Sequence, residues 1–62
     1  MFEGYLGKAC SVSVLTGNGQ VKSNIYYKGI LESCDEDFLV LKLSKVKVFI
    51  AIKYIITVEF DD

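Results

Sequence analysis

The sequence predicts an all-β fold, a small, strongly bent, five-stranded antiparallel barrel with a short N-terminal helical turn, formed by residues 1–62 as a single domain. Two observations lead to this prediction. Apolar and polar residues alternate with a period of two in several short segments, as they do in half-buried strands. Clusters of glycine, asparagine or acidic residues separate these segments, and such residues favour turns.

The N-terminal part predicts a helical turn followed by a hairpin. Residues 2–8 are too short and too rich in glycine for a long helix, so we expect one helical turn that ends near Gly7. Residues 10–15 alternate small polar and apolar side chains and form the first expected strand. Residues 16–20 contain two glycines and an asparagine, which tolerate positive φ and predict a hairpin loop.

The middle of the chain predicts two more strands. The second is expected over residues 25–34, with Gly29 in its interior. A glycine inside a strand marks a bulge, a tight bend or a close approach of another backbone, and in a small barrel we expect it at the bend. A charged turn follows at residues 35–37, and the nearly continuous apolar run of residues 38–43 predicts a third strand that is buried on both faces.

The last two strands are expected over residues 46–52 and 55–60, with Lys53 and Tyr54 at a tight corner between them. In the fifth strand the even-numbered residues from 56 to 60 are apolar and are predicted to share one face. Both strands are too apolar for exposed edges, which natural sheets protect with charges, proline or bulges. A domain this small also buries only about 60% of its unfolded surface. We therefore expect these strands to pair with other copies of the chain in a homo-oligomer.

The residue types argue against a metal site and against catalysis. Cys10 and Cys34 are far apart and the chain has no histidine, so a zinc site has too few ligands and we expect no metal or cofactor. Both cysteines lie in apolar, strand-like segments, where free thiols are expected and a disulfide or a reactive thiol is the alternative. Without histidine there is no Ser-His or Cys-His pair, and we expect a binding protein and not an enzyme.

Charge and hydropathy limit the possible partners. A net charge of −1 argues against binding nucleic acid by bulk charge, because counterion release requires clustered Lys and Arg. Any nucleic-acid site must therefore be local. The sequence shows no signal-peptide pattern and no apolar run of the roughly 18 residues that would span a bilayer. We expect a soluble, cytoplasmic protein that does not contact membranes.

Three segments have a spacing that matches a known family. Residues 6–14 (LGKACSVSV) resemble its entry into the first strand, and residues 27–35 (YKGILESCD) resemble its first motif, with Gly29 and Asp35 at the family's spacing. Residues 49–58 (FIAIKYIITV) resemble the apolar frame of its second motif. On these residues the chain resembles the Sm and Sm-like family, which includes the bacterial Hfq branch, and the resemblance covers nearly the whole chain.

The resemblance implies a bent five-stranded barrel of the Sm-like, SH3-like type and closed rings, in which the fourth strand of one copy pairs with the fifth of the next. It also implies that two loops near the pore bind single-stranded RNA, by stacking and by hydrogen bonds to the bases. The chain departs from the family at these loops. Asp37, Phe38 and Leu39 stand where many members have an aromatic residue or histidine, a methionine and an asparagine. Residues 51–52 replace an Arg-Gly pair.

The candidate RNA-binding residues are therefore Asp37 and Phe38 of the first loop and Lys53 and Tyr54 of the second. Lys53 would contact phosphate and Tyr54 would stack on a base, and a ring would repeat these contacts. Alternatively they are a surface lysine and a tyrosine that packs at the corner. Glu36 and Asp37 would repel a phosphate backbone, and could instead attract a cation or a basic peptide, so the alternative function is a ring-shaped protein scaffold without RNA binding.

Three further lysines surround the turn between the third and fourth expected strands. They are Lys42, Lys45 and Lys47. These lysines either form a basic rim on one face of the ring or protect the sheet edge against aggregation.

Overall fold

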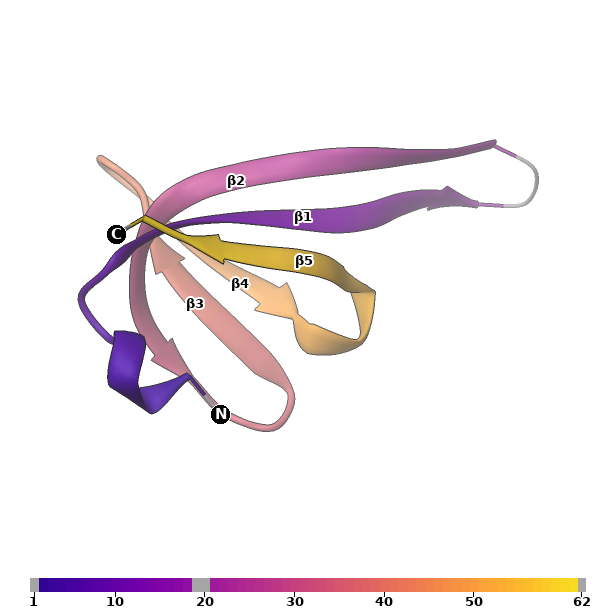
Figure 1. Ribbon diagram of the computed structural model, residues 1–62. Helices are drawn as coiled ribbons and strands as arrows, with labels where there is room; N and C mark the ends of the chain where they lie inside the picture. Colours follow the sequence, from indigo (N-terminus) through magenta and orange to yellow (C-terminus); the bar gives the residue numbers. More distant parts are fainter. Residues whose placement is uncertain (1, 19–20, 62) are drawn as a thin grey trace.

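The computed structural model describes residues 2–18 and 21–61, which form one antiparallel sheet of five strands with two short 3-10 turns (Figure 1). In chain order the elements are η1 (Glu3–Tyr5), β1 (Ala9–Asn18), β2 (Val21–Cys34), β3 (Phe38–Lys42), β4 (Lys47–Ala51), η2 (Ile52–Tyr54) and β5 (Ile55–Phe60). The order of strands across the sheet is β4-β3-β2-β1-β5. β4 and β5, the two strands predicted to join copies, are therefore the two edges of the sheet.

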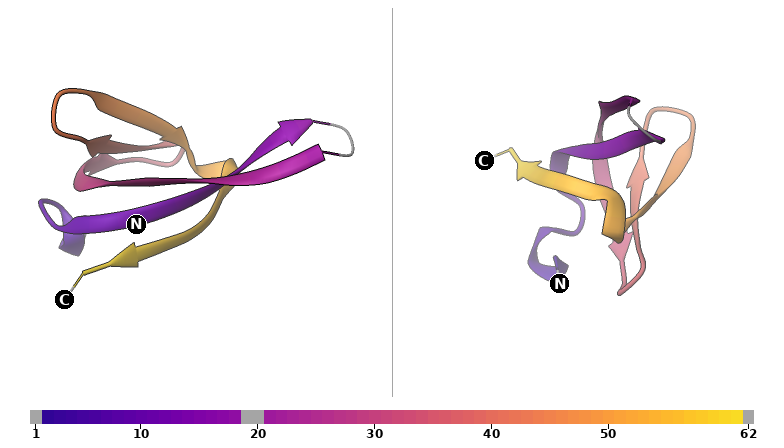
Figure 2. Two further views of the ribbon diagram at one scale, coloured as in Figure 1. Left: turned by 90° about the horizontal axis from the view of Figure 1, so that it is seen from above. Right: turned by 90° about the vertical axis from the view of Figure 1, so that its right-hand side faces the viewer.

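The predicted all-β class, with five antiparallel strands and an N-terminal helical turn, is confirmed. The sheet is not closed into a barrel. In the described part of the chain β4 pairs with β3 and β5 pairs with β1, and the two edge strands do not pair with each other. Figure 2 shows that they diverge from η2, whereas closure requires edge strands to meet. No helix within the described ranges is long and apolar enough to span a membrane.

The hairpin of β1 and β2 is longer than predicted and projects beyond the rest of the sheet (Figure 1). The sequence predicts a loop over residues 16–20 and a second strand that begins at residue 25, but the ladder continues through this polar stretch. Thr16 pairs with Ser23, and its hydroxyl Oγ1 donates a hydrogen bond of 3.1 Å to the Ser23 carbonyl oxygen. Residues 19–20 of the predicted loop lie outside the described residues.

β2 bends sharply, so that its first part pairs with β1 and its last part with β3 (Figure 1). Gly29 lies at this bend, where another backbone approaches it closely. A Cβ atom added to Gly29 would lie 2.8 Å from the carbonyl oxygen of Lys42 and 3.0 Å from Leu43 Cδ1. An irregularity in the β2–β3 pairing between Leu31 and Ser33 adds to the bend. The predicted role of this glycine is confirmed.

The core lies against the inner face of the bent sheet, and its buried members are Cys10, Val12, Val14, Leu31, Leu39, Leu41 and Ile50. All three interior residues of β3 are buried, as the apolar run predicts. Cys10 is buried and Cys34 half-buried, and both are free thiols, so the prediction of free cysteines is confirmed. Burial, assisted by the charge of Asp61, raises the pKa of the Cys10 thiol.

β5 has the predicted bounds, but a bulge changes the face of one residue. The pairing with β1 shifts between Ser13 and Val14, so Val14 pairs with Ile55 and Ser13 pairs with Thr57. Ile55 therefore packs against the core, while Ile56 is 49% exposed. Val58 and Phe60 also pack against the core, so the prediction that Ile56 shares one face with them is wrong, because a bulge reverses the alternation of side chains.

Candidate functional site

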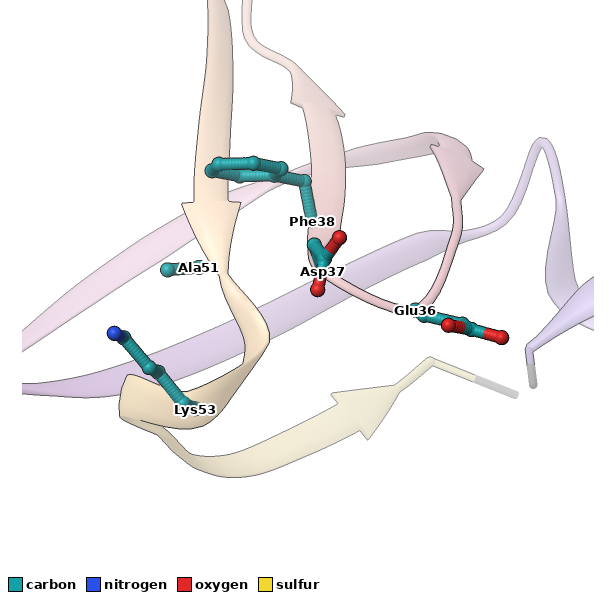
Figure 3. Close-up of a pocket in the computed structure, with 5 residues that line it drawn as sticks. All are labelled: Glu36, Asp37, Phe38, Ala51 and Lys53. Carbon is teal, nitrogen blue, oxygen red and sulfur yellow. The ribbon is translucent and has the colours of Figure 1, made fainter.

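A pocket of about 280 Å³ lies between the turn that precedes β3 and the turn that follows β4 (Figure 3). Its lining residues are Glu36, Asp37, Phe38, Ala51 and Lys53. Three of the four predicted RNA-binding residues, Asp37, Phe38 and Lys53, therefore lie at one pocket although they come from different turns. This pocket is called the inter-turn pocket below.

The register of β3 and β4 brings the two turns together. Phe38 pairs with Ala51 across the two strands, and the backbone N–H of Ile52 donates a hydrogen bond of 2.9 Å to the carbonyl oxygen of Asp37. Side chains that face each other across strands lie about 4.5–5.5 Å apart at Cβ. Because Ala51 carries only a methyl group, space remains beside the Phe38 ring, and this space is part of the inter-turn pocket.

Asp35 holds the first turn in place. Its carboxylate Oδ1 accepts hydrogen bonds of 2.8 Å from the backbone N–H groups of Asp37 and Phe38. Its own N–H donates a hydrogen bond of 2.9 Å to the carbonyl oxygen of Phe38. The two bonds from N–H groups lower the pKa of the Asp35 carboxyl group, because they stabilise its ionised form. Asp35 therefore holds the first turn and fixes the backbone of two pocket residues.

The pocket residues offer one aromatic ring and one cation. The Phe38 side chain is 45% exposed, and Figure 3 shows its ring at one end of the pocket and Lys53 at the other. Lys53 forms no ion pair with Asp37 or Glu36 within the described residues. The pocket could therefore contact both a planar ring and an anionic group of one ligand.

Tyr54, the fourth predicted residue, does not line the inter-turn pocket. Its ring lies below the amine of Lys53, with Nζ 5.2 Å from the ring centroid, in the range of a cation–π contact. The ring also lines a separate apolar groove of about 180 Å³ beside β4, together with Leu15, Phe49 and other residues. Tyr54 thus contacts Lys53, but it does not line the same pocket as Asp37 and Phe38.

Two lining residues were not among the predicted RNA contacts. The sequence marks Ala51 only as the loss of a family arginine, and Glu36 only as a carboxylate that would repel phosphate or attract a cation or a basic peptide. Ala51 could have been identified from the antiparallel register that pairs it with Phe38. Predicting that register requires the exact centre of the β3–β4 turn.

One of the lysines near the β3–β4 turn forms an ion pair. Lys47 Nζ lies 3.0 Å from Glu32 Oε2, and both side chains are largely exposed. Lys47 begins the edge strand β4, a position where lysine protects an edge from unwanted pairing. Within residues 2–18 and 21–61 there is no group of three or more side chains that could hold a metal ion.

Comparison with known proteins gives no match: no protein-family model, no curated protein and no solved structure is similar to this chain. The function of the protein is therefore argued from the chemistry of the inter-turn pocket and from the sheet edges, since folds alone do not determine function.

Proposed function

We propose that the protein is an Sm-like, ring-forming protein of the cytoplasm that binds single-stranded RNA at the inter-turn pocket and has no catalytic activity. The observation that supports this most strongly is the placement of Phe38 and Lys53 at one pocket. An exposed aromatic ring binds a base by stacking, which is worth about 1–3 kcal/mol per base. A lysine without an ion-pair partner binds the adjacent phosphate.

The sheet edges support the proposed ring. β4 and β5 are the two edge strands, and each carries a large exposed apolar side chain, Phe49 at 65% and Ile56 at 49% exposure. Pairing β4 of one copy with β5 of the next would cover both edges and continue the sheet from copy to copy. A closed ring would also repeat the pocket, so that weak contacts to one RNA strand add together.

A second candidate function is a protein-binding ring that does not bind RNA. The observation that favours it is the presence of two carboxylates, Glu36 and Asp37, at the same pocket as Lys53. These groups repel phosphate and attract cationic side chains. The two candidates separate at low salt, where phosphate contacts are strongest: the first predicts RNA binding and the second predicts none.

Native mass spectrometry of the full chain, with and without a short uridine-rich or adenine-rich RNA, tests the proposal. We expect a closed homo-oligomer that adds one RNA strand per ring at low salt and loses it as the salt concentration rises. A monomer would contradict the ring. A closed oligomer that ignores RNA even at low salt would contradict RNA binding and favour the protein-binding ring.

A further inference from the structure

The side chains of the inter-turn pocket differ in the hydrogen bonds that they can offer to a nucleobase. Phe38 is sequence-tolerant, because every base has a face that can stack. The polar side chains that line the pocket are the carboxylates of Glu36 and Asp37 and the amine of Lys53. No neutral amide or hydroxyl side chain from residues 2–18 or 21–61 lines it. Base selectivity must therefore come from groups that only accept or only donate hydrogen bonds.

Asp37 is the carboxylate best placed to read a base. Its backbone is fixed on both sides, since its N–H donates to Asp35 Oδ1 at 2.8 Å and its carbonyl oxygen accepts from Ile52 N–H at 2.9 Å. Its side-chain carboxylate has no hydrogen-bond or ion-pair partner in the described part of the chain. Figure 3 shows Asp37 beside Phe38 at the pocket, whereas Glu36 points away from Phe38 and Lys53.

We infer that the inter-turn pocket prefers guanine over the other RNA bases; this inference rests on the proposed RNA binding and adds base selectivity to it. An ionised carboxylate accepts hydrogen bonds and cannot donate them. The Watson–Crick edge of guanine presents two adjacent donors, N1–H and the N2 amino group, which match the two oxygens of a carboxylate in a bidentate pair. The amine of Lys53 then meets acceptors, the guanine O6 or a neighbouring phosphate.

The other bases match the carboxylate of Asp37 less well. Uracil places its single N3–H donor between two carbonyl oxygens, so a carboxylate that approaches it also meets a lone pair. Adenine and cytosine present an amino group next to a ring nitrogen that accepts, and only one of the two carboxylate oxygens is matched. Guanine alone offers two neighbouring donors to Asp37.

The test compares the affinity of the protein for an oligouridylate with its affinity for the same strand carrying one guanosine or one inosine, measured by fluorescence anisotropy at constant salt. A bidentate pair discriminates by about 1–3 kcal/mol, so we expect the guanosine strand to bind roughly 5- to 150-fold more tightly than the oligouridylate. Inosine lacks the N2 amino group, and its strand should have intermediate affinity.

Two matched variants separate base reading from charge. Asp37→Asn keeps the shape of the side chain but adds a donor, so the preference for guanosine should be lost. Glu36→Gln removes the same charge one residue away and should raise the affinity for both strands while the preference stays. Equal affinity of the native protein for both strands, or an unchanged preference in Asp37→Asn, would overturn the inference and leave RNA binding intact. Failure to bind any strand would overturn both.

Discussion

Phe38 and Ala51 face each other across β3 and β4, and this pairing sets the geometry of the inter-turn pocket. It places the turn that carries Asp37 next to the turn that carries Lys53, and the hydrogen bond between Ile52 N–H and the Asp37 carbonyl oxygen continues the contact beyond the strands. The pocket thus depends on the register of β3 and β4. The three interior residues of β3 are buried, and this gives the pocket a rigid support.

The Asp35 turn should make stability depend on pH. The pKa of Asp35 is lowered by its hydrogen bonds to backbone N–H groups, so its contribution to stability is present above the unfolded pKa of about 3.9 and is lost as pH falls through the lower, folded value. Asp35→Ala should lower the melting temperature at neutral pH, and the difference from the native protein should shrink in acid.

Thermal unfolding followed by circular dichroism at several pH values measures this effect. Asp35→Asn retains a side-chain oxygen acceptor and should lose less stability than Asp35→Ala at neutral pH. Glu36→Ala is the matched control, because the Glu36 carboxylate accepts no hydrogen bond within the described residues. A gap between Asp35→Ala and the native protein that stays constant down to strongly acidic pH would contradict the role of Asp35.

Gly29 should not tolerate a side chain. A Cβ atom there would lie 2.8 Å from the Lys42 carbonyl oxygen, and forcing apart two strands of a packed sheet typically costs about 1–3 kcal/mol. Gly29→Ala should therefore lower the free energy of unfolding by that amount in urea denaturation. Gly4→Ala is the control, since nothing lies within 4 Å of its added Cβ, and its effect should stay within about 0.5 kcal/mol. Equal effects of the two substitutions would contradict the close approach.

β4 and β5 are the edge strands of the sheet. We therefore expect a charged side chain introduced on β4 to block self-association. Phe49→Lys places a cation on the edge strand, as natural sheets do to prevent pairing, and should convert the oligomer into a monomer. Ile30→Lys is the control, because Ile30 is 41% exposed but lies on β2 where it pairs with Ala9 of β1 on one side and with Lys42 of β3 on the other. It should leave the oligomer intact.

Size-exclusion chromatography with light scattering measures both variants. An oligomer of native size in Phe49→Lys would show that β4 is not at the interface. Loss of the oligomer in Ile30→Lys as well would indicate that exposed apolar residues in general, and not the sheet edge, hold the copies together.

Local patterns predicted much of the fold. The bounds of β5, the buried run of β3 and the bend at Gly29 each depend on a few adjacent residues and are visible in the sequence. The length of the β1–β2 hairpin was missed, because its polar outer part is held by backbone pairing and hydroxyl contacts such as Thr16 with Ser23, which leave no hydrophobic pattern. The exposure of Ile56 was missed because a bulge depends on the partner strand.

The same distinction applies to the site. Asp37, Phe38 and Lys53 were selected as a set, and the structure brings them to one pocket. Tyr54 was grouped with them as a ring on which a base would stack, but the corner is a 3-10 turn, in which consecutive side chains point in different directions. Ala51 was missed because its contribution is the space it leaves beside Phe38, and space depends on the cross-strand partner.

The measurement that most directly tests the proposed function is the affinity of a short single-stranded RNA for the native protein, Phe38→Ala and Lys53→Gln over a range of salt concentrations. We expect Phe38→Ala to weaken binding roughly 5- to 150-fold, because the base no longer stacks on a ring. We expect Lys53→Gln to reduce the slope of log affinity against log salt by about 0.7 for each phosphate that the protein no longer neutralises. RNA binding that neither substitution changes, or no binding by the native protein at low salt, would contradict the assignment of this pocket as an RNA site.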